Sequence, residues 1–138
     1  MVGVVVVTHG QLAAELLNAA EMIVGDLPRF TAVSIGWHDD THDAREEIAA
    51  AVTKVRQGQE GQAVLIVTDM FGGTPSNLAM TFLGADVEVI TGVNLPMLIK
   101  LASLKENPNL LDVAREMREH GRNAIWVASD LLRGQKTS

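Results

Sequence analysis

The chain has 138 residues, of which 47% are hydrophobic and 20% are charged, and its formal net charge is −6. This length and composition predict one globular domain with a single core. The basic residues are scattered along the chain, which argues against nucleic acid or an anionic membrane as a partner. The sequence has no cysteine, which excludes disulfides and thiolate metal sites, and no apolar run of membrane-spanning length. We therefore expect a soluble, cytoplasmic protein.

Hydrophobic periodicity predicts strands that alternate with helices along the chain. Val2–Val7 is a continuous β-branched run, which is typical of a strand buried on both faces. Residues 11–24 carry apolar side chains at helical spacing, and Gly25 ends this helix. The expected buried face of the helix consists of Leu12, Leu16, Ala20 and Ile23. A second strand follows at Phe30–Ile35.

The same alternation continues through the middle of the chain. Residues 40–58 predict a helix that a glycine ends. The apolar face of this helix consists of Ala44, Ile48, Ala51, Val52 and Val55. The run AVLIVTD at 63–69 is a third strand, as apolar as the first. The next segment, MFGGTPSNLAMTFLG, predicts a glycine turn and a helix with Thr74 as N-cap, Pro75 at its first position and Gly84 at its end.

The last third of the chain predicts one more strong strand and several shorter elements. VEVIT at 87–91 is the fourth strand, and helices are expected over residues 94–105 and 108–121. AIWVA at 124–128 is expected to be a short fifth strand, antiparallel at a sheet edge or paired with another subunit. A polar tail then follows at 130–138.

Repeated strand–helix units with apolar strands predict an α/β fold. Right-handed crossovers and short loops favour an open, doubly wound, mostly parallel sheet of four strands flanked by helices, with the short fifth strand at an edge. Residues 1–129 would form this single domain, followed by the tail.

Two of the predicted strands end in polar residues that are suited to chemistry. The first strand ends in Thr8-His9-Gly10 and the third ends in Thr68-Asp69. In open α/β sheets, ligands bind at the carboxyl ends of the strands where the winding direction reverses, and the first and third strands are the usual neighbours there. A carboxylate that accepts the Nδ1 proton leaves the Nε2 lone pair free, so His9 could act as a nucleophile that carries a group covalently.

The segment after Asp69 indicates which group His9 would carry. Gly72 and Gly73 allow the backbone N–H groups to turn outward, Thr74 adds a hydroxyl, and the helix that starts just after Gly10 has its N-terminus at the same place. Such neutral donors suit a phosphoryl group, and neither motif holds a lysine or arginine. The sequence lacks a P-loop lysine, a G-x-G-x-x-G fingerprint and a G-x-S-x-G elbow, which argues against nucleotide hydrolysis, dinucleotide binding and serine hydrolase chemistry.

Five motifs, THG, AAEMIVGD, TDMFGGTPSN, VITGVNLPML and EHGR, occur in this order between about residue 2 and residue 128. Together they resemble the enzyme IIA domain of the mannose family of the bacterial phosphoenolpyruvate-dependent sugar phosphotransferase system. The resemblance implies a phosphotransferase without metal or cofactor, in which HPr phosphorylates His9 on Nε2 and His9 passes the group to a histidine of enzyme IIB. Asp69 would be the carboxylate partner of His9. Gly72, Gly73 and Thr74 would match the phosphate-contacting turn.

The resemblance also implies a homodimer whose last strand is exchanged between subunits, which suits AIWVA, and peripheral association with membrane permease subunits through IIB. The family often has Thr-Trp where this chain has Met70-Phe71, so Phe71 makes the rim of the site more apolar. Trp37 is expected to line the same rim. Leu95 and Met97 are expected to contact partners because this region lies near the family's active site.

Two alternatives remain open. A regulatory module would use the same phosphorylation of His9 as a charge switch for a partner outside transport. A metal-binding protein would use His38 and His42, although Asp40 and Asp43 beside them are equally well explained as acids at a helix N-terminus.

Overall fold

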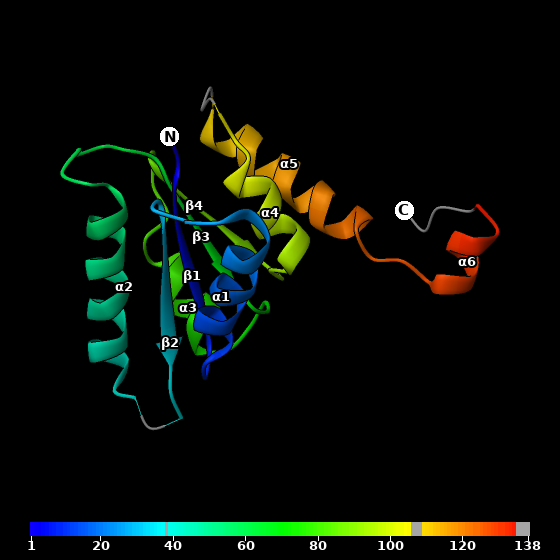
Figure 1. Cartoon of the computed structure of the whole chain (residues 1–138). Coiled ribbons are helices and arrows are strands. Elements are labelled where there is room, and N and C mark those ends of the chain that lie inside the picture. Colours follow the sequence, from blue (N-terminus) through cyan, green and yellow to red (C-terminus); the bar gives the residue numbers. More distant parts are fainter. Residues whose placement is uncertain (38, 106–108, 135–138) are drawn as a thin grey trace.

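The structure, a computed structural model, describes residues 1–37, 39–105 and 109–134. Its centre is a sheet of four parallel strands in the order β2-β1-β3-β4 (Figure 1). The strands are β1 (Gly3–His9), β2 (Phe30–Ile35), β3 (Val64–Thr68) and β4 (Val87–Thr91). The predicted open, parallel, four-stranded sheet is therefore confirmed, and the two most apolar runs of the sequence form its central strands.

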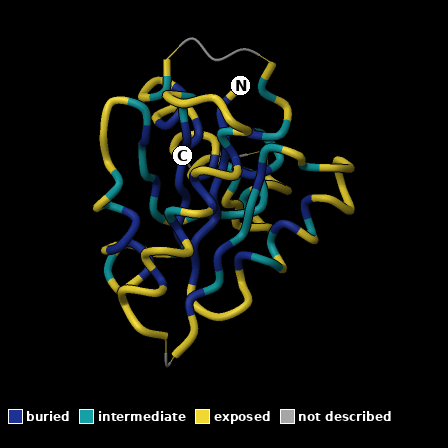
Figure 2. Tube along the Cα trace, turned by 90° about the vertical axis from the view of Figure 1, so that its left-hand side faces the viewer, coloured by how far each residue is buried: buried dark blue, intermediate teal, exposed yellow. Residues whose placement is uncertain are grey.

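Helices cover both faces of the sheet. They are α1 (Leu12–Val24), α2 (Thr41–Val55), α3 (Thr74–Met80), α4 (Leu95–Ala102) and α5 (Leu110–Asn123). A further helix, α6 (Ala128–Leu132), has no buried residue and lies apart from the sheet (Figure 1). Alternate side chains of β1 point to opposite faces: Val4 and Val6 pack with α1, α4 and α5, whereas Val5 and Val7 pack with α2 and α3. Figure 2 shows the buried segments in the middle of the molecule and the exposed segments around them.

The winding of the chain places one pair of strand ends together. From β1 the chain crosses to β2 on one side and then to β3 on the other, so β1 and β3 are neighbours at the point where the winding reverses. Val7 of β1 is aligned with Thr68 of β3. The residues that follow, His9 and Asp69, therefore leave the sheet at the same edge, as predicted.

The helices differ from the prediction in which residues they bury and where they end. The buried residues of α1 are Ala13, Leu17 and Ala20, whereas Leu12 is exposed and Ile23 is 60% exposed. A helix with apolar residues on more than one stripe can satisfy the periodicity in two ways, and the sheet decides between them. The helix that was expected to reach Gly84 ends at Met80. Asn109 caps α5, and the expected helix start at Pro108 lies outside the described residues.

The predicted fifth strand is absent from the described chain. Residues 125–127 have no regular structure, and α6 begins at Ala128, so part of the expected polar tail is helical. Figure 1 shows this segment leading away from the body of the molecule and carrying α6 with it. A strand needs a neighbouring backbone for its hydrogen bonds, and the sheet of the described residues ends at β4 without pairing with this segment. No helix among the described residues is long and apolar enough to cross a membrane.

Candidate functional site

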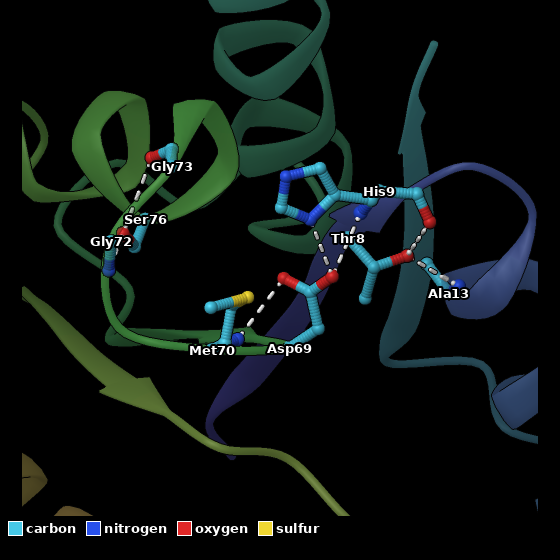
Figure 3. Close-up of polar contacts among 8 residues, drawn as sticks. All are labelled: Thr8, His9, Ala13, Asp69, Met70, Gly72, Gly73 and Ser76. Atoms are coloured by element: carbon cyan, nitrogen blue, oxygen red, sulfur yellow. Dashed lines mark hydrogen bonds and ion pairs between the residues drawn. The ribbon is translucent and has the colours of Figure 1, made fainter. Parts of the chain in front are cut away.

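His9 and Asp69 form a tight pair at the carboxyl ends of β1 and β3. His9 Nδ1 lies 2.7 Å from Asp69 Oδ2, and the backbone N–H of His9 donates to the same oxygen at 3.0 Å (Figure 3). The other carboxylate oxygen accepts the Met70 N–H at 3.1 Å. Asp69 therefore holds the ring, the backbone of His9 and its own loop at once. The predicted meeting of imidazole and carboxylate is confirmed.

The electrostatics of the pair determine which ring nitrogen is available. Burial alone would raise the pKa of the Asp69 carboxyl, but the hydrogen bonds from the ring and backbone of His9 outweigh it, and the pKa is lowered from its ordinary value. Asp69 is therefore ionised at neutral pH. Because an ionised carboxylate only accepts hydrogen bonds, the tautomer of the neutral His9 ring that fits has its proton on Nδ1 and its lone pair on Nε2. The His9 side chain is 53% exposed, so a partner can reach the ring.

The glycine turn after Asp69 lies against the free edge of the His9 ring. Gly72 and Gly73 have φ angles of 92° and 93°, a conformation that side chains disfavour. A Cβ atom built on Gly73 would lie 3.2 Å from both Cε1 and Nε2 of His9. A residue with a side chain at position 73 would therefore crowd the nitrogen that carries the lone pair, and glycine avoids this.

The N-terminus of α3 differs from the prediction. Thr74 is the first residue of the helix, not its N-cap, and no side chain caps it; Gly73 occupies the cap position. The Thr74 residue is exposed beside the glycine turn. On the other side of the site, Gly10 has a φ of 55°, and its N–H donates to the Ile35 carbonyl at 2.9 Å, which ties the start of the α1 loop to β2.

Two fully buried hydroxyl groups hold the loops on either side of His9, and the sequence analysis missed both roles. Thr8 Oγ1 accepts the Ala13 N–H of α1 at 2.7 Å. Ser76 Oγ accepts the Gly72 N–H at 2.9 Å and donates to the Gly73 carbonyl at 3.3 Å. A serine three or four residues after a glycine pair is the sequence signal that could have indicated the second role.

The predicted rim residues have different surroundings. Trp37 is 92% exposed and Phe71 is 74% exposed, so both offer apolar surface to a partner. Leu95 is half-buried. Met97 is only 2% exposed and belongs to the core under α4, so its side chain offers no surface and we remove it from the rim. It is the third residue of a helix whose apolar side faces the sheet.

The histidines that suggested a metal site receive no support from the structure. His42 lies in the first turn of α2, where its N–H donates to the carboxylate of the N-cap Asp40 at 2.7 Å. His38 lies outside the described residues. Within residues 1–37, 39–105 and 109–134, no group of three His, Asp or Glu side chains could hold a metal ion. Asp40 is the N-cap of α2, and Asp43 lies in the first turn of the same helix.

Comparison with known proteins agrees with this fold. The family model described as "PTS system fructose IIA component" matches residues 3–117. The chain is 29% identical over 140 residues to the PTS system fructose-specific EIIA component of Bacillus subtilis (strain 168). This alignment covers all of this chain and 94% of the relative.

Two further relatives extend the comparison. The PTS system mannose-specific EIIAB component of Escherichia coli (strain K12) is 30% identical over 129 residues, which is 90% of this chain and 38% of that longer protein. The solved structure of the mannose/sorbose specific IIA subunit from Enterococcus faecalis superposes with a TM-score of 0.81 at 28% identity, covering 91% of this chain and 93% of that chain. The chain therefore belongs to the EIIA-man family of sugar phosphotransferase system IIA components.

Proposed function

We propose that this protein is a phosphocarrier of the sugar phosphotransferase system, which accepts a phosphoryl group from phospho-HPr on His9 and passes it to a histidine of enzyme IIB. One observation carries the proposal: the 2.7 Å bond from His9 Nδ1 to Asp69 leaves Nε2 with its lone pair on a half-exposed ring. In Figure 3 this nitrogen points away from Asp69. As such a carrier, the protein would work in the cytoplasm.

The transfer step follows from this geometry. The Nε2 lone pair of His9 attacks the phosphorus, and the N–P bond forms while the bond from phosphorus to the donor breaks and its electron pair leaves with the donor. Because Nδ1 keeps its proton, the phosphorylated ring gains a positive charge. The ionised Asp69 beside Nδ1 compensates that charge. Transfer to the IIB histidine is the same step in reverse, with a new acceptor.

The surroundings of Nε2 suit a phosphoryl group that is held only briefly. The backbone of Gly73 borders the nitrogen, and the exposed Thr74 follows it. The N-terminus of α1, a helix of 13 residues, begins three residues after His9 and favours negative charge nearby. We place the phosphate contacts on Gly73 and Thr74. Gly10 and Gly72 shape the turns on either side, because their N–H groups are bonded to the Ile35 carbonyl and the Ser76 hydroxyl. Since neither motif contains a lysine or arginine, the group is not trapped by a fixed cation.

Exposed apolar side chains around the site provide a docking surface for HPr and IIB. Trp37 and Phe71 are the most exposed of them, and Met70 and Leu12 are about half exposed. Apolar and aromatic residues in the centre of an interface supply much of its binding energy. Through IIB, the protein would associate peripherally with membrane permease subunits.

A homodimer is part of the proposal. β4 is an edge strand, and a groove of about 290 Å³ beside it is lined by β4 and by residues of α5, including Leu111 and Arg115. The segment at 125–127 carries three exposed apolar side chains and leads away from its own body. We propose that this segment of one copy adds a strand to the β4 edge of another, because edge strands and apolar extended segments pair readily.

Phosphorylation with labelled phosphoenolpyruvate, enzyme I and HPr tests the proposal. Wild-type protein should take up one acid-labile, base-stable phosphate, and His9→Ala should take up none. His42→Ala is the matched control, because His42 is an exposed histidine at the start of α2 whose backbone N–H bonds to Asp40, and it should be labelled like the wild type. Label on His9→Ala would overturn the proposal. Labelled protein that passes its phosphate to none of the IIB proteins of the same genome would favour the regulatory alternative.

A further inference from the structure

The carbonyl of Gly73 accepts the Asn77 N–H of α3 at 3.0 Å, but Gly72 needs an anchor that the residues of the glycine turn cannot provide. Gly72 and Gly73 both have φ near 90°, and neither has a side chain that could pack against the body of the protein. Consecutive glycines have the largest conformational freedom of any dipeptide, so an unheld turn would sample many positions. Yet Gly73 lies so near the ring that a Cβ atom built on it would be 3.2 Å from His9 Nε2, so the position of the turn sets the space around this nitrogen.

Ser76 supplies the anchor through a single buried hydroxyl. Its Oγ accepts the N–H of Gly72 at 2.9 Å and donates to the carbonyl of Gly73 at 3.3 Å, so it joins a peptide group on each side of the turn (Figure 3). Ser76 is fully buried in α3. Leu78 and Ala79 of the same helix pack in the core with β1, which fixes the hydroxyl relative to the sheet. The bond therefore ties the turn to the strand that carries His9.

We propose that Ser76 is a positioning residue for phosphoryl transfer, which holds the Gly72–Gly73 turn against His9 Nε2 while touching neither the ring nor the phosphoryl group. This inference rests on the proposed function. It also assigns the N–H of Gly72 to the hydroxyl of Ser76, so that the contribution of Gly72 is the shape of the turn. The phosphoryl contacts then fall to Gly73 and Thr74.

The test compares Ser76→Ala with Ser103→Ala. The Ser103 hydroxyl makes the same kind of bond to the carbonyl three residues before it, Lys100, at 2.8 Å, but lies at the end of α4 and holds no turn near His9. Alanine is a good helix former, so both variants should fold and melt like the wild type. Amide hydrogen exchange of Gly72 reports the bond itself, and it should accelerate about tenfold in Ser76→Ala and stay unchanged in Ser103→Ala.

Transfer kinetics from phospho-HPr report the positioning role. Ser76→Ala should lower kcat about tenfold, because small displacements of positioning groups are costly, and should change KM for HPr less than twofold, because the exposed rim is kept. A serine that only stabilises the fold would not lower kcat while leaving KM for HPr unchanged. Unchanged exchange at Gly72, or faster exchange with unchanged kcat, would overturn the inference. Wild-type protein that takes up no phosphate would instead remove the proposed function, and this inference with it.

Discussion

Replacement of Asp69 by asparagine tests the central pair of the site with almost no change in shape. The carboxylate accepts three hydrogen bonds: His9 Nδ1 and His9 N–H on one oxygen, and Met70 N–H on the other. An amide has only one acceptor oxygen. If that oxygen faces His9, the amide NH₂ lies against the Met70 N–H, and two donors meet. If the oxygen faces Met70, the NH₂ lies against the His9 N–H and donates to Nδ1, which favours the tautomer with the proton on Nε2. Neither orientation reproduces the native arrangement.

The size of the effect follows from what the substitution removes. A hydrogen bond to a charged group contributes about 1.5–3 kcal/mol, and the Asp69 carboxylate is bonded to His9 Nδ1 at 2.7 Å. At about 1.4 kcal/mol for each factor of ten, loss of this bond should slow phosphorylation of His9 by about 10- to 100-fold. Rapid-quench measurement of transfer from phospho-HPr determines the rate, and nitrogen chemical shifts of His9 determine the tautomer.

A matched variant separates this effect from a general loss of charge. Asp43→Asn removes an exposed carboxylate in the first turn of α2 and should leave the rate within about twofold of wild type. A rate for Asp69→Asn equal to that of Asp43→Asn would refute the assignment of Asp69. A wild-type His9 whose neutral ring carries its proton on Nε2 would refute the reasoning about the ring proton.

Three further predictions follow from the same contacts. Gly73→Ala should slow phosphorylation at least tenfold, because its Cβ would lie 3.2 Å from His9 Nε2. Gly58→Ala also places alanine at a positive φ, 78°, but has open space around it and should leave the rate unchanged. The pKa of Asp69 is lower in the folded protein than its ordinary value of 3.8, so the ionised carboxylate stabilises the fold above pH 3.8. This stability is lost as the pH falls through the pKa of the folded state. The free energy of unfolding in urea should therefore decrease more steeply below about pH 3.8 in the wild type than in Asp69→Asn. Trp126→Asp should convert a dimer to a monomer by light scattering, and a wild-type monomer would refute the exchanged strand.

The order of elements and the location of the site could be predicted from the sequence because they depend on local signals. The apolar runs at Val2–Val7 and 64–67, which are mostly β-branched, are typical of strands buried on both faces, and these are the central β1 and β3. In a parallel sheet the carboxyl ends of neighbouring strands coincide, so the residues that follow them, His9 and Asp69, must meet. This inference needed no knowledge of side-chain packing.

The tertiary structure alone decided the features that depend on contacts with another element of the fold. The buried stripe of α1 and the burial of Met97 depend on how the helices rest on the sheet, because a helix with several apolar positions fits the same periodicity in more than one rotation. The segment at 125–127 forms no strand because strand formation requires a partner backbone. The role of Ser76 depends on the path of the glycine turn, since a hydroxyl can bond a distant N–H only where the folded backbone presents it.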